Sequence, residues 1–301
     1  LAASEVTVSG TWGNGRVIHA QLETRGAVGW IADDGRLTIR TSSQVPFLVR
    51  DELAYLLSMP ADGIRVLTAW VGGGFGGKQE IFTEDLVALA VLRTGRPVAY
   101  EMTRTEEFQR TAVRHPMRVS VDLGARADGV LTAMKVDVLS DTGAYGNHSR
   151  GVLFHACAES MSLYAAPAKW LDAEVVYTNN VPSGAFRGYG LGQVIFGIEC
   201  AMDELAVRLG IDPFELRRMN AVTPDEAPLA HHAEPEEDLV WGSYGLDQCL
   251  DLAEQALARG NGVEPPAGDN WRVGEGMAAA MIATMAPFGH ISKVTVTLRP
   301  G

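Results

Sequence analysis

The chain has 301 residues, of which 47% are hydrophobic and 21% are charged, which excludes an intrinsically disordered chain and fits one large or two ordinary domains. Its 37 acidic and 25 basic residues give a net charge of −12, which argues against a nucleic-acid backbone or an anionic membrane as the main partner. No run of 18 apolar residues is present, so we predict no membrane-spanning segment. The three widely spaced cysteines favour reduced thiols in a cytoplasmic protein, and they exclude a four-cysteine iron–sulfur cluster held within this chain.

The first hundred residues alternate between segments that favour strands and segments that favour helices. An Asp-Asp-Gly turn at residues 33–35 predicts a hairpin, and leucines on one face predict a helix soon after it. The predicted strands are residues 16–21, 27–32, 36–41, 64–71 and 98–102, and the predicted helices are residues 45–58 and 80–93.

The remainder begins with a hairpin around the Ala-Asp-Gly sequence of residues 127–129, and residues 141–168 after it show no clear period. The predicted strands are residues 117–123, 130–139, 174–177, 273–280 and 293–298, and the predicted helices are residues 194–209, 212–219 and 246–259. Residues 221–242 are rich in Pro, Glu and His and predict a surface linker. The last strand-like segment is followed by Pro300 and Gly301, so we expect the polypeptide to continue or a partner to extend the sheet.

Residues 72–78, with the sequence GGGFGGK, are the most distinctive local feature, because backbone without Cβ atoms can approach a bound group closely. A Walker A loop fits the spacing, but Gln79 stands where Ser or Thr would hold magnesium. A nicotinamide dinucleotide site also fits, with Gly72–Gly77 as G-x-G-x-x-G and Glu101 after the next strand, at a longer spacing than usual. The remaining alternatives are a loop for another phosphate-bearing cofactor and a tight loop against a neighbouring backbone.

The order of motifs along the chain resembles the molybdenum hydroxylases, the family of xanthine dehydrogenase and aldehyde oxidase. The resemblance covers nearly the whole chain and rests on several blocks in the expected order, not on residues 72–78 alone. The blocks are Glu23–Gly26, Thr41–Gln44, Val71–Gln79, Thr83–Asp85, Thr94–Pro97, Asp141–Gly146, Tyr177–Gly190 followed by Gln193, Asp203–Ala206 and Asp212–Arg218.

This resemblance implies a molybdopterin cofactor that carries molybdenum, often in the cytosine dinucleotide form in bacterial members. The implied reaction is hydroxylation of an electrophilic carbon with oxygen derived from water, with electrons leaving through 2Fe-2S clusters to FAD. The metal would be held by the pterin dithiolene, and the 2Fe-2S and FAD groups would lie on other domains or subunits. The implied fold is α+β, with mixed β-sheets and helices packed on one side.

Individual residues match positions that lie beside the cofactor in this family. Gln44 matches a glutamine that hydrogen-bonds the apical oxo group of the metal, where an uncharged donor is needed. Gly74, Phe75 and Gly76 match the loop beside the metal. Arg187 matches an arginine next to the cofactor, where a guanidinium can hold polar oxygens in a fixed fork. The resemblance therefore predicts cofactor binding by all five residues and catalytic roles for Gln44 and Arg187.

Two residues are predicted to face the substrate. Tyr189 matches an aromatic position, more often Phe in the family, at which a planar ring packs. Gln79 replaces a glutamate that binds the purine in animal-type xanthine enzymes, and its neutral amide puts that type of purine recognition in doubt. We expect the neighbouring Glu80 to point elsewhere.

Part of the family's machinery has no match here. The general base is a glutamate in a late Gly-Glu-Pro-Pro segment, and we interpret the sequence GVEPP at residues 262–266 as coincidental because it comes too early. We expect the base, a second cofactor segment and the electron-transfer centres on a C-terminal part or on partner subunits. The predicted divisions are residues 1–222 for a first molybdopterin-binding domain, 223–242 for a linker and 243–301 for the start of a second such domain.

Other reactive side chains are predicted to serve the fold or to line a pocket. His115, His148 and His155 have no compact zinc-binding spacing, and Cys157 is predicted to be a small buried residue. The side chains of His231 and His232 are expected to be solvated in the linker.

Together these features predict the molybdopterin-binding part of an oxidoreductase that hydroxylates a nitrogen heteroaromatic, purines included, or an aldehyde. The alternatives are an NAD-dependent dehydrogenase that uses the Gly72–Gly77 loop and a cofactor-free fragment that catalyses nothing. The expected partners are a small-molecule substrate, iron–sulfur and flavin subunits or domains, and the rest of the molybdopterin-binding region, with neither nucleic acid nor membrane among them.

Overall fold

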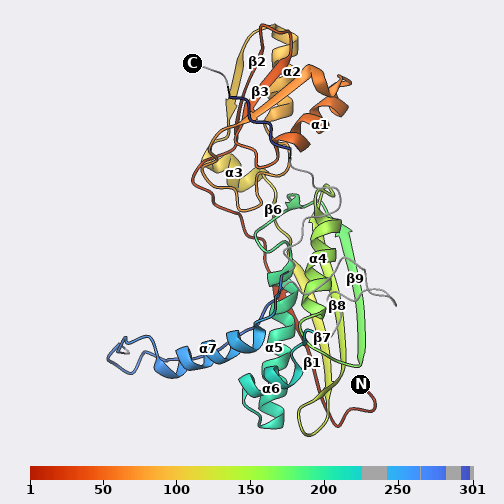
Figure 1. Ribbon diagram of the computed structural model, residues 1–301, viewed down its shortest axis with the longest axis vertical. Coiled ribbons are helices and arrows are strands. Elements are labelled where there is room, and N and C mark those ends of the chain that lie inside the picture. Colours follow the sequence, from red (N-terminus) through yellow and green to blue (C-terminus); the bar gives the residue numbers. More distant parts are fainter. Residues whose placement is uncertain (226–242, 265, 283–292, 299–301) are drawn as a thin grey trace.

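The computed structural model describes residues 1–225, 243–264, 266–282 and 293–298. Two bodies, each a β-sheet with helices against it, lie end to end along the long axis of the molecule (Figure 1). We name them the upper and lower bodies after their places in Figure 1. The chain starts in the lower body, builds the upper body, and then returns to complete the lower one.

The lower body contains a four-stranded mixed sheet in the order β1-β7-β8-β9. β1, β7 and β8 pair antiparallel, whereas β9 pairs parallel with β8. Alternate residues of the central strands, such as Val119 and Val136, are buried in a core shared with α4 and α5. The elements are β1 Val6–Asn14, β7 Met117–Ala125, β8 Leu131–Gly143, β9 Ala168–Tyr177, α4 Ser149–Met161, α5 Leu191–Leu209 and α6 Pro213–Asn220.

The upper body contains a second four-stranded sheet in the order β4-β3-β2-β5, in which only β3 and β4 are parallel. Its core joins Leu37 and Ile39 of the sheet to Leu53 of α1 and Val87 and Val91 of α2. The elements are β2 Gly26–Ile31, β3 Leu37–Thr41, α1 Pro46–Leu57, the 3-10 turn η1 Ala61–Gly63, β4 Ile64–Thr68, α2 Glu84–Thr94, β5 Val98–Glu101 and α3 Arg104–Arg110.

A short parallel pair connects the two bodies: β6 Val113–Arg114 pairs with β10 Ser183–Gly184. β6 lies at the waist of the molecule, whereas α7 Leu246–Arg259 extends away from the lower body (Figure 1). The waist is therefore where segments from both halves of the sequence meet.

The predicted fold class is confirmed, and most predicted elements are present. The predicted strands at residues 16–21, 273–280 and 293–298 are wrong, because these segments form no strand in the structure. The predicted helix 80–93 begins only at Glu84, and β1, α3 and α4 were not predicted. Most of the predicted linker, including His231 and His232, lies outside the described residues. Within the described part of the chain, no helix has both the length and the apolar character needed to cross a bilayer.

Candidate functional site

Two loops meet at the waist: the glycine loop, residues 72–78, and the arginine loop, residues 183–190. The backbone N–H of Arg187 donates to the carbonyl of Phe75 at 2.9 Å. Gly76 has a φ of +91°, and a Cβ atom there would lie 3.0 Å from the carbonyl carbon of Ala185 and from Cα of Phe186. Only glycine therefore permits this close approach of the two backbones.

Gln44, just before α1, is fixed on the glycine loop through its side-chain oxygen. Oε1 accepts hydrogen bonds from the backbone N–H groups of Gly76 at 3.2 Å and Lys78 at 3.1 Å. The backbone N–H of Gln44 in turn donates to the carbonyl of Lys78 at 2.9 Å. Two donors on one oxygen identify that atom as the carbonyl, so Nε2 points away from the loop. Among the described residues this amide nitrogen has no acceptor, and the Gln44 side chain is exposed.

The exposed surface of the two loops carries an aromatic ring and a cation. Phe75 has a φ of +54°, which is uncommon for a residue with a side chain, and is 49% exposed. The Arg187 side chain is exposed, and its guanidinium makes no hydrogen bond or ion pair to any described residue. The structure thus joins the loops that carry Phe75 and Arg187 and fixes Gln44 on the first of them, with a free amide donor and a free guanidinium.

The side chain of Lys78 is buried in an ion pair within the protein. It is therefore not available to bind phosphate, as the lysine of a Walker A loop would. It is 2% exposed, and its Nζ lies 2.6 Å from a carboxylate oxygen of Glu23. The same oxygen accepts the N–H of Gly72 at 2.7 Å. Burial alone would raise the pKa of Glu23, but the hydrogen bonds from Lys78 and Gly72 outweigh it and lower the pKa. Lys78 therefore neutralises a carboxylate of its own chain.

The geometry of the glycine loop also argues against a nicotinamide dinucleotide site. In that fold the glycine loop leads directly into a helix whose N-terminus faces the pyrophosphate. Here α2 begins several residues beyond Gly77, and Glu84 and Asp85 occupy its first turn. Two carboxylates at that helix end repel an anion.

Beneath the two loops, His19 joins the chain segment before β2 to the arginine loop. Its Nε2 lies 2.7 Å from the carbonyl oxygen of Ala185, and its ring centroid lies 4.5 Å from that of Phe186. Burial lowers the pKa of His19, although its bond to the Ala185 carbonyl opposes this effect. A Cβ atom on Gly77 would come within 2.6 Å of the His19 ring. No sequence motif pointed to His19.

A buried ion pair also supports the glycine loop. The guanidinium of Arg25 binds the carbonyl of Gly77 and the carboxylate of Glu107 on α3. Glu107 also accepts the Nε2–H of Gln21 at 2.9 Å. Arg25 stands in one of the family-like blocks of the sequence, and that was the only signal of its role.

Glu80 lies under the arginine loop, where one oxygen accepts the N–H of Ala185 at 3.2 Å. The other oxygen is buried and has no partner among the described residues. Burial raises the pKa of Glu80 to about 7, against the opposing effects of the Ala185 N–H and Arg25. A Cβ atom on Gly184 would lie 2.8 Å from the carboxyl carbon and 2.7 Å from Cβ of Ala112, so a side chain there would displace Glu80 and crowd Ala112.

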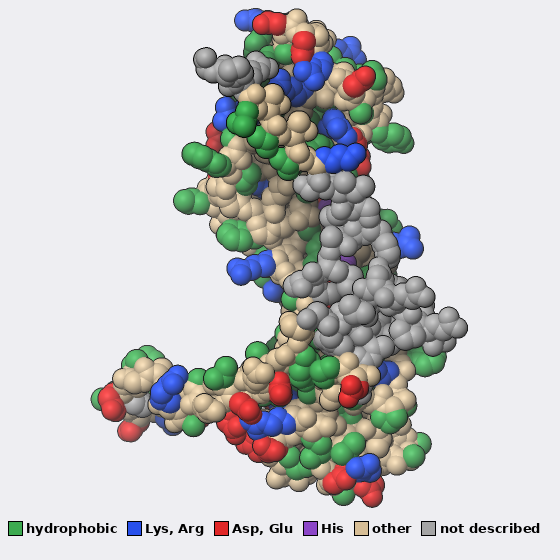
Figure 2. Space-filling model, viewed as in Figure 1, with side chains coloured by type: hydrophobic (Ala, Val, Ile, Leu, Met, Phe, Trp, Pro, Cys, Tyr) green, Lys and Arg blue, Asp and Glu red, His purple; other side chains and the backbone are tan. Residues whose placement is uncertain are grey.

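Tyr189, one of the two predicted substrate residues, bonds to His148, which precedes α4. The Tyr189 hydroxyl lies 2.9 Å from Nδ1 of His148. Burial lowers the pKa of His148, and an interaction of its ring with the backbone of Gln79 partly opposes this. The ring of His155 stands edge-on to that of Tyr189, with centroids 5.5 Å apart. Figure 2 shows histidine side chains at the waist of this face.

His115 and Cys157 are both buried in the lower body, where they serve the fold. His115 is buried, with Nε2 2.7 Å from the hydroxyl of Ser149, and burial lowers its pKa to about 4. Cys157 is buried in the core, and burial raises its pKa to about 12. Among the described residues no group of three His, Cys, Asp or Glu side chains is placed to hold a metal ion.

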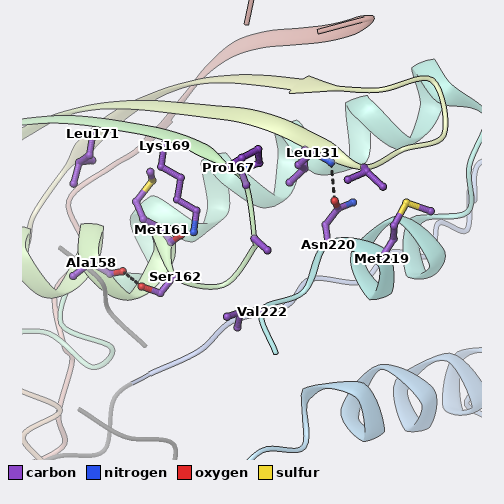
Figure 3. A pocket seen from close by; sticks show the side chains of 13 residues that line it. Leu131, Ala158, Met161, Ser162, Pro167, Lys169, Leu171, Met219, Asn220 and Val222 are labelled. Atoms are coloured by element: carbon purple, nitrogen blue, oxygen red, sulfur yellow. Dashed lines mark hydrogen bonds between the residues drawn. The ribbon is translucent and has the colours of Figure 1, made fainter. Parts of the chain in front are cut away.

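A separate pocket of about 980 Å³ opens at the far end of α4, beside the start of β9 and the end of α6 (Figure 3). Its polar side chains serve the fold: Asn220 accepts the N–H of Leu131 at 2.8 Å, and Lys169 donates to the carbonyl of Met161 at 2.8 Å. No residue of the predicted site lines this pocket. It is therefore not the place where the predicted chemistry would occur.

The fold is that of a molybdopterin-binding domain. The family model described as "molybdopterin cofactor-binding domain" matches residues 1–221, and the chain belongs to this family. The chain is 34% identical over 252 residues to the xanthine dehydrogenase molybdenum-binding subunit of Escherichia coli O157:H7, covering 83% of this chain and 33% of that protein. It is 37% identical over 217 residues to the nicotinate dehydrogenase large molybdopterin subunit of Eubacterium barkeri, covering 72% of this chain and 51% of that protein.

Solved structures show the same fold. The aldehyde oxidoreductase from Desulfovibrio gigas superimposes with a TM-score of 0.78 at 33% identity, over 84% of this chain and 27% of that one. The quinoline 2-oxidoreductase from Pseudomonas putida 86 superimposes with a TM-score of 0.76 at 30% identity, over 86% and 33%. The chain spans about a third of the length of several curated relatives that it matches.

Proposed function

We propose that this chain is the cofactor-binding part of a molybdenum hydroxylase and that the glycine and arginine loops hold the molybdopterin cofactor. The observation that carries this proposal is a pair of free donors on two joined loops. The amide of Gln44 is held on the glycine loop, the guanidinium of Arg187 belongs to the arginine loop, and a backbone hydrogen bond ties the two loops together. Both side chains are exposed, and neither the Nε2 amide of Gln44 nor the guanidinium of Arg187 bonds to a described residue. An oxygen-rich group is what two such donors bind.

The residues present fit the cofactor. Gln44 Nε2 would donate to an oxo group, and the Arg187 guanidinium would hold polar oxygens. Gly74 leaves room for the side chain of Gln44, and Gly76 lets the glycine loop lie against the arginine loop, so both glycines hold the two donors in place. Phe75 would cover one side of the site. When bound, the cofactor supplies the two-electron oxidation and the delivery of water-derived oxygen to the substrate carbon.

We further propose that the substrate is a nitrogen heteroaromatic, purine-like compounds included, or an aldehyde. Tyr189 would present its ring as a wall, and Gln79 would line the same side as a neutral group. Enzymes whose names include xanthine, nicotinate, quinoline and aldehyde are among those similar to this chain, which supports this range of substrates. The neutral amide of Gln79 favours a substrate that needs no carboxylate partner.

Other parts of the catalytic machinery are expected outside this chain. We propose the cytosine dinucleotide form of the cofactor, 2Fe-2S and FAD groups on other domains or subunits, and a general-base glutamate outside this chain. We propose a division into residues 1–222, 223–242 and 243–301, the last starting a second molybdopterin-binding domain. A cytoplasmic location agrees with the three unpaired cysteines.

Elemental analysis of the complete enzyme, paired with an NADH-binding assay, tests the proposed function. Molybdenum near one atom per copy of this chain is expected. Tight NADH binding without molybdenum would favour the dehydrogenase, and absence of both would favour a fragment without cofactor.

Two variants test the site residues within the same enzyme. Gln44→Glu keeps an oxygen for the two loop N–H groups but removes the amide donor, so turnover should fall on the order of 100-fold while the loop stays folded. Arg187→Ala should lower both molybdenum content and turnover. Arg40→Ala is the matched control, because Arg40 is also an exposed arginine but lies on β3. Unchanged turnover in Gln44→Glu and Arg187→Ala would refute the site even if molybdenum were present.

A further inference from the structure

We propose that His148 is a positioning residue that holds Tyr189, and with it the wall against which a planar substrate ring lies. This inference rests on the proposed function. It adds a residue that acts through another side chain and that no motif in the sequence singled out.

The geometry of His148 carries the inference. Its Nδ1 lies 2.9 Å from the Tyr189 hydroxyl. A neutral imidazole has one acceptor and one donor. With its proton on Nε2, the ring offers Nδ1 as the acceptor for the O–H of Tyr189. The ring of His148 thus holds the hydroxyl of a residue predicted to face the substrate.

Tyr189 depends on such support because its backbone is unusual. Its φ is +48°, between Gly188 and Gly190, both of which also have positive φ. The arginine loop bends sharply at this point, and the half-buried Tyr189 ring is packed against the edge of the lower-body core. A Cβ atom on Gly151 would stand 3.1 Å from the Tyr189 hydroxyl, so the space for that hydroxyl depends on glycine at 151.

His148 is itself held in place by the start of α4. It is the residue that precedes the helix, and its carbonyl accepts the N–H of Val152 at 2.9 Å. α4 belongs to the lower body, as does the arginine loop that carries Tyr189. Through His148, the start of the helix therefore sets the position of the Tyr189 hydroxyl.

This arrangement explains the hydroxyl of Tyr189. A phenylalanine could offer the same ring face to a substrate but could not bind Nδ1 of His148. The hydroxyl is engaged with the protein and does not need a partner on the substrate. Loss of His148 should therefore have the same effect as loss of the hydroxyl.

His155 provides a matched control on the same helix. Its ring also contacts the Tyr189 ring edge-on, but its Nδ1 binds Glu159 at 2.9 Å and not the hydroxyl. A His155→Phe substitution retains an edge-on ring. It should therefore leave the position of Tyr189 unchanged.

The test is a double-mutant cycle in the complete enzyme, with His148→Phe, Tyr189→Phe and both together. Quinoline serves as the planar probe and acetaldehyde as a probe without a ring. For each variant we would measure the quinoline dissociation constant by calorimetry on enzyme prepared without molybdenum, and KM and kcat on loaded enzyme. Molybdenum content is measured throughout, so a failure of the proposed function is seen separately as absence of the metal from the wild type.

Each single variant should weaken quinoline binding and raise its KM about 3- to 10-fold, the effect of one hydrogen bond, with kcat changed less than about 2-fold. The double variant should be no worse than either single one, because both remove the same bond. His148→Asn, whose side-chain oxygen replaces the acceptor at Nδ1, should recover most of the affinity. His155→Phe and the acetaldehyde kinetics should stay near wild type.

Three results would overturn the inference. The effects of His148→Phe and Tyr189→Phe could multiply in the double variant, which would show independent roles. His155→Phe could weaken quinoline binding as much as His148→Phe does, which would show a general packing effect. A wild-type enzyme that contains molybdenum but binds no quinoline would show that Tyr189 is not a wall for a planar ring.

Discussion

A single methyl group at Gly74 should displace Gln44 without disturbing the backbone around it. A Cβ atom at this position would lie 2.5 Å from the amide carbon of Gln44 and 2.9 Å from its Cγ, closer than non-bonded carbons approach. The φ of Gly74 is not in the left-handed region, so alanine meets no backbone strain there. The collision is with the side chain of Gln44 alone, and that side chain must swing away.

The cost follows from the hydrogen bonds that Gln44 makes. When its amide leaves, the N–H groups of Gly76 and Lys78 lose their acceptor. At about 0.5–1.5 kcal/mol for each net hydrogen bond, the loss is about 1–3 kcal/mol. Alanine also reduces the conformational entropy of the unfolded chain, which raises the free energy of unfolding by about 0.4–1 kcal/mol. We expect Gly74→Ala to lower the free energy of unfolding by about 1–2 kcal/mol and to lower turnover much as Gln44→Ala does.

Urea unfolding and kcat of the complete enzyme would be compared for Gly74→Ala, Gln44→Ala and the double variant. The double variant should resemble the single ones in kcat, because both changes remove the same donor. Gly192→Ala is the control: its Cβ would meet no atom within 4 Å, and it lies in α5. Wild-type kcat in Gly74→Ala, or multiplied effects in the double variant, would refute the claim that Gly74 acts through Gln44.

Three further predictions concern charged groups around the fold. Glu80, whose pKa burial raises to about 7, stabilises the fold in its protonated form, so this contribution is complete at acidic pH and is lost as the pH rises through 7. Glu80→Gln should flatten the pH dependence of urea unfolding between about pH 5 and 8, and an unchanged profile would contradict the assignment. Burial works against ionised Asp141, but hydrogen bonds from groups such as Thr178 and Arg16 outweigh it and lower its pKa to about 2. Its stabilisation should be present above about pH 4 and lost toward pH 2, and acid unfolding of Asp141→Asn should lack that component. Arg217 is fully buried and pairs with Glu199 at 3.0 Å, so Arg217→Met should cost about 3–5 kcal/mol in urea unfolding, and adding Glu199→Gln should recover part of it. A loss below about 1 kcal/mol would show that water replaces the guanidinium.

Elements with a regular apolar period could be predicted from the sequence, and those without one could not. α5 shows a clear amphipathic pattern and was predicted nearly to its ends. α4 was missed because it is buried on many sides, with Ser149, Glu159 and Ser160 among its buried residues, so no apolar stripe stands out. β1 was missed because glycines and exposed polar residues interrupt its alternation. The predicted strand at residues 16–21 has strand-like composition, but its residues make side-chain and loop contacts at the waist instead of a ladder.

The same distinction holds for the candidate site, of which the loops could be predicted from the sequence and the side chains that join them could not. Both loops were recognisable, because glycines where Cβ atoms would collide leave a visible pattern in the sequence. The side chains that join the loops were not recognisable: His19 and Glu80 were placed in a predicted strand and a predicted helix that the structure does not have at these positions, and His148 belongs to a segment without a clear period. Glu80 and Ala185 are 105 residues apart in the sequence, and only the folded chain brings them together. Contacts of this kind carry no local signal.

The meeting of the two loops at the waist has a consequence for assembly. The glycine loop belongs to the upper body and the arginine loop to the lower one, so neither body alone contains the site. A ligand that spans both loops binds only the docked arrangement, and linkage then adds its binding energy to the docking of the two bodies. At a free concentration 1,000 times the dissociation constant, this amounts to about 4.1 kcal/mol. Bound cofactor would thus stabilise the contact between the upper and lower bodies. Proteolysis at the waist should therefore be slower in the protein that contains the cofactor than in the protein without it.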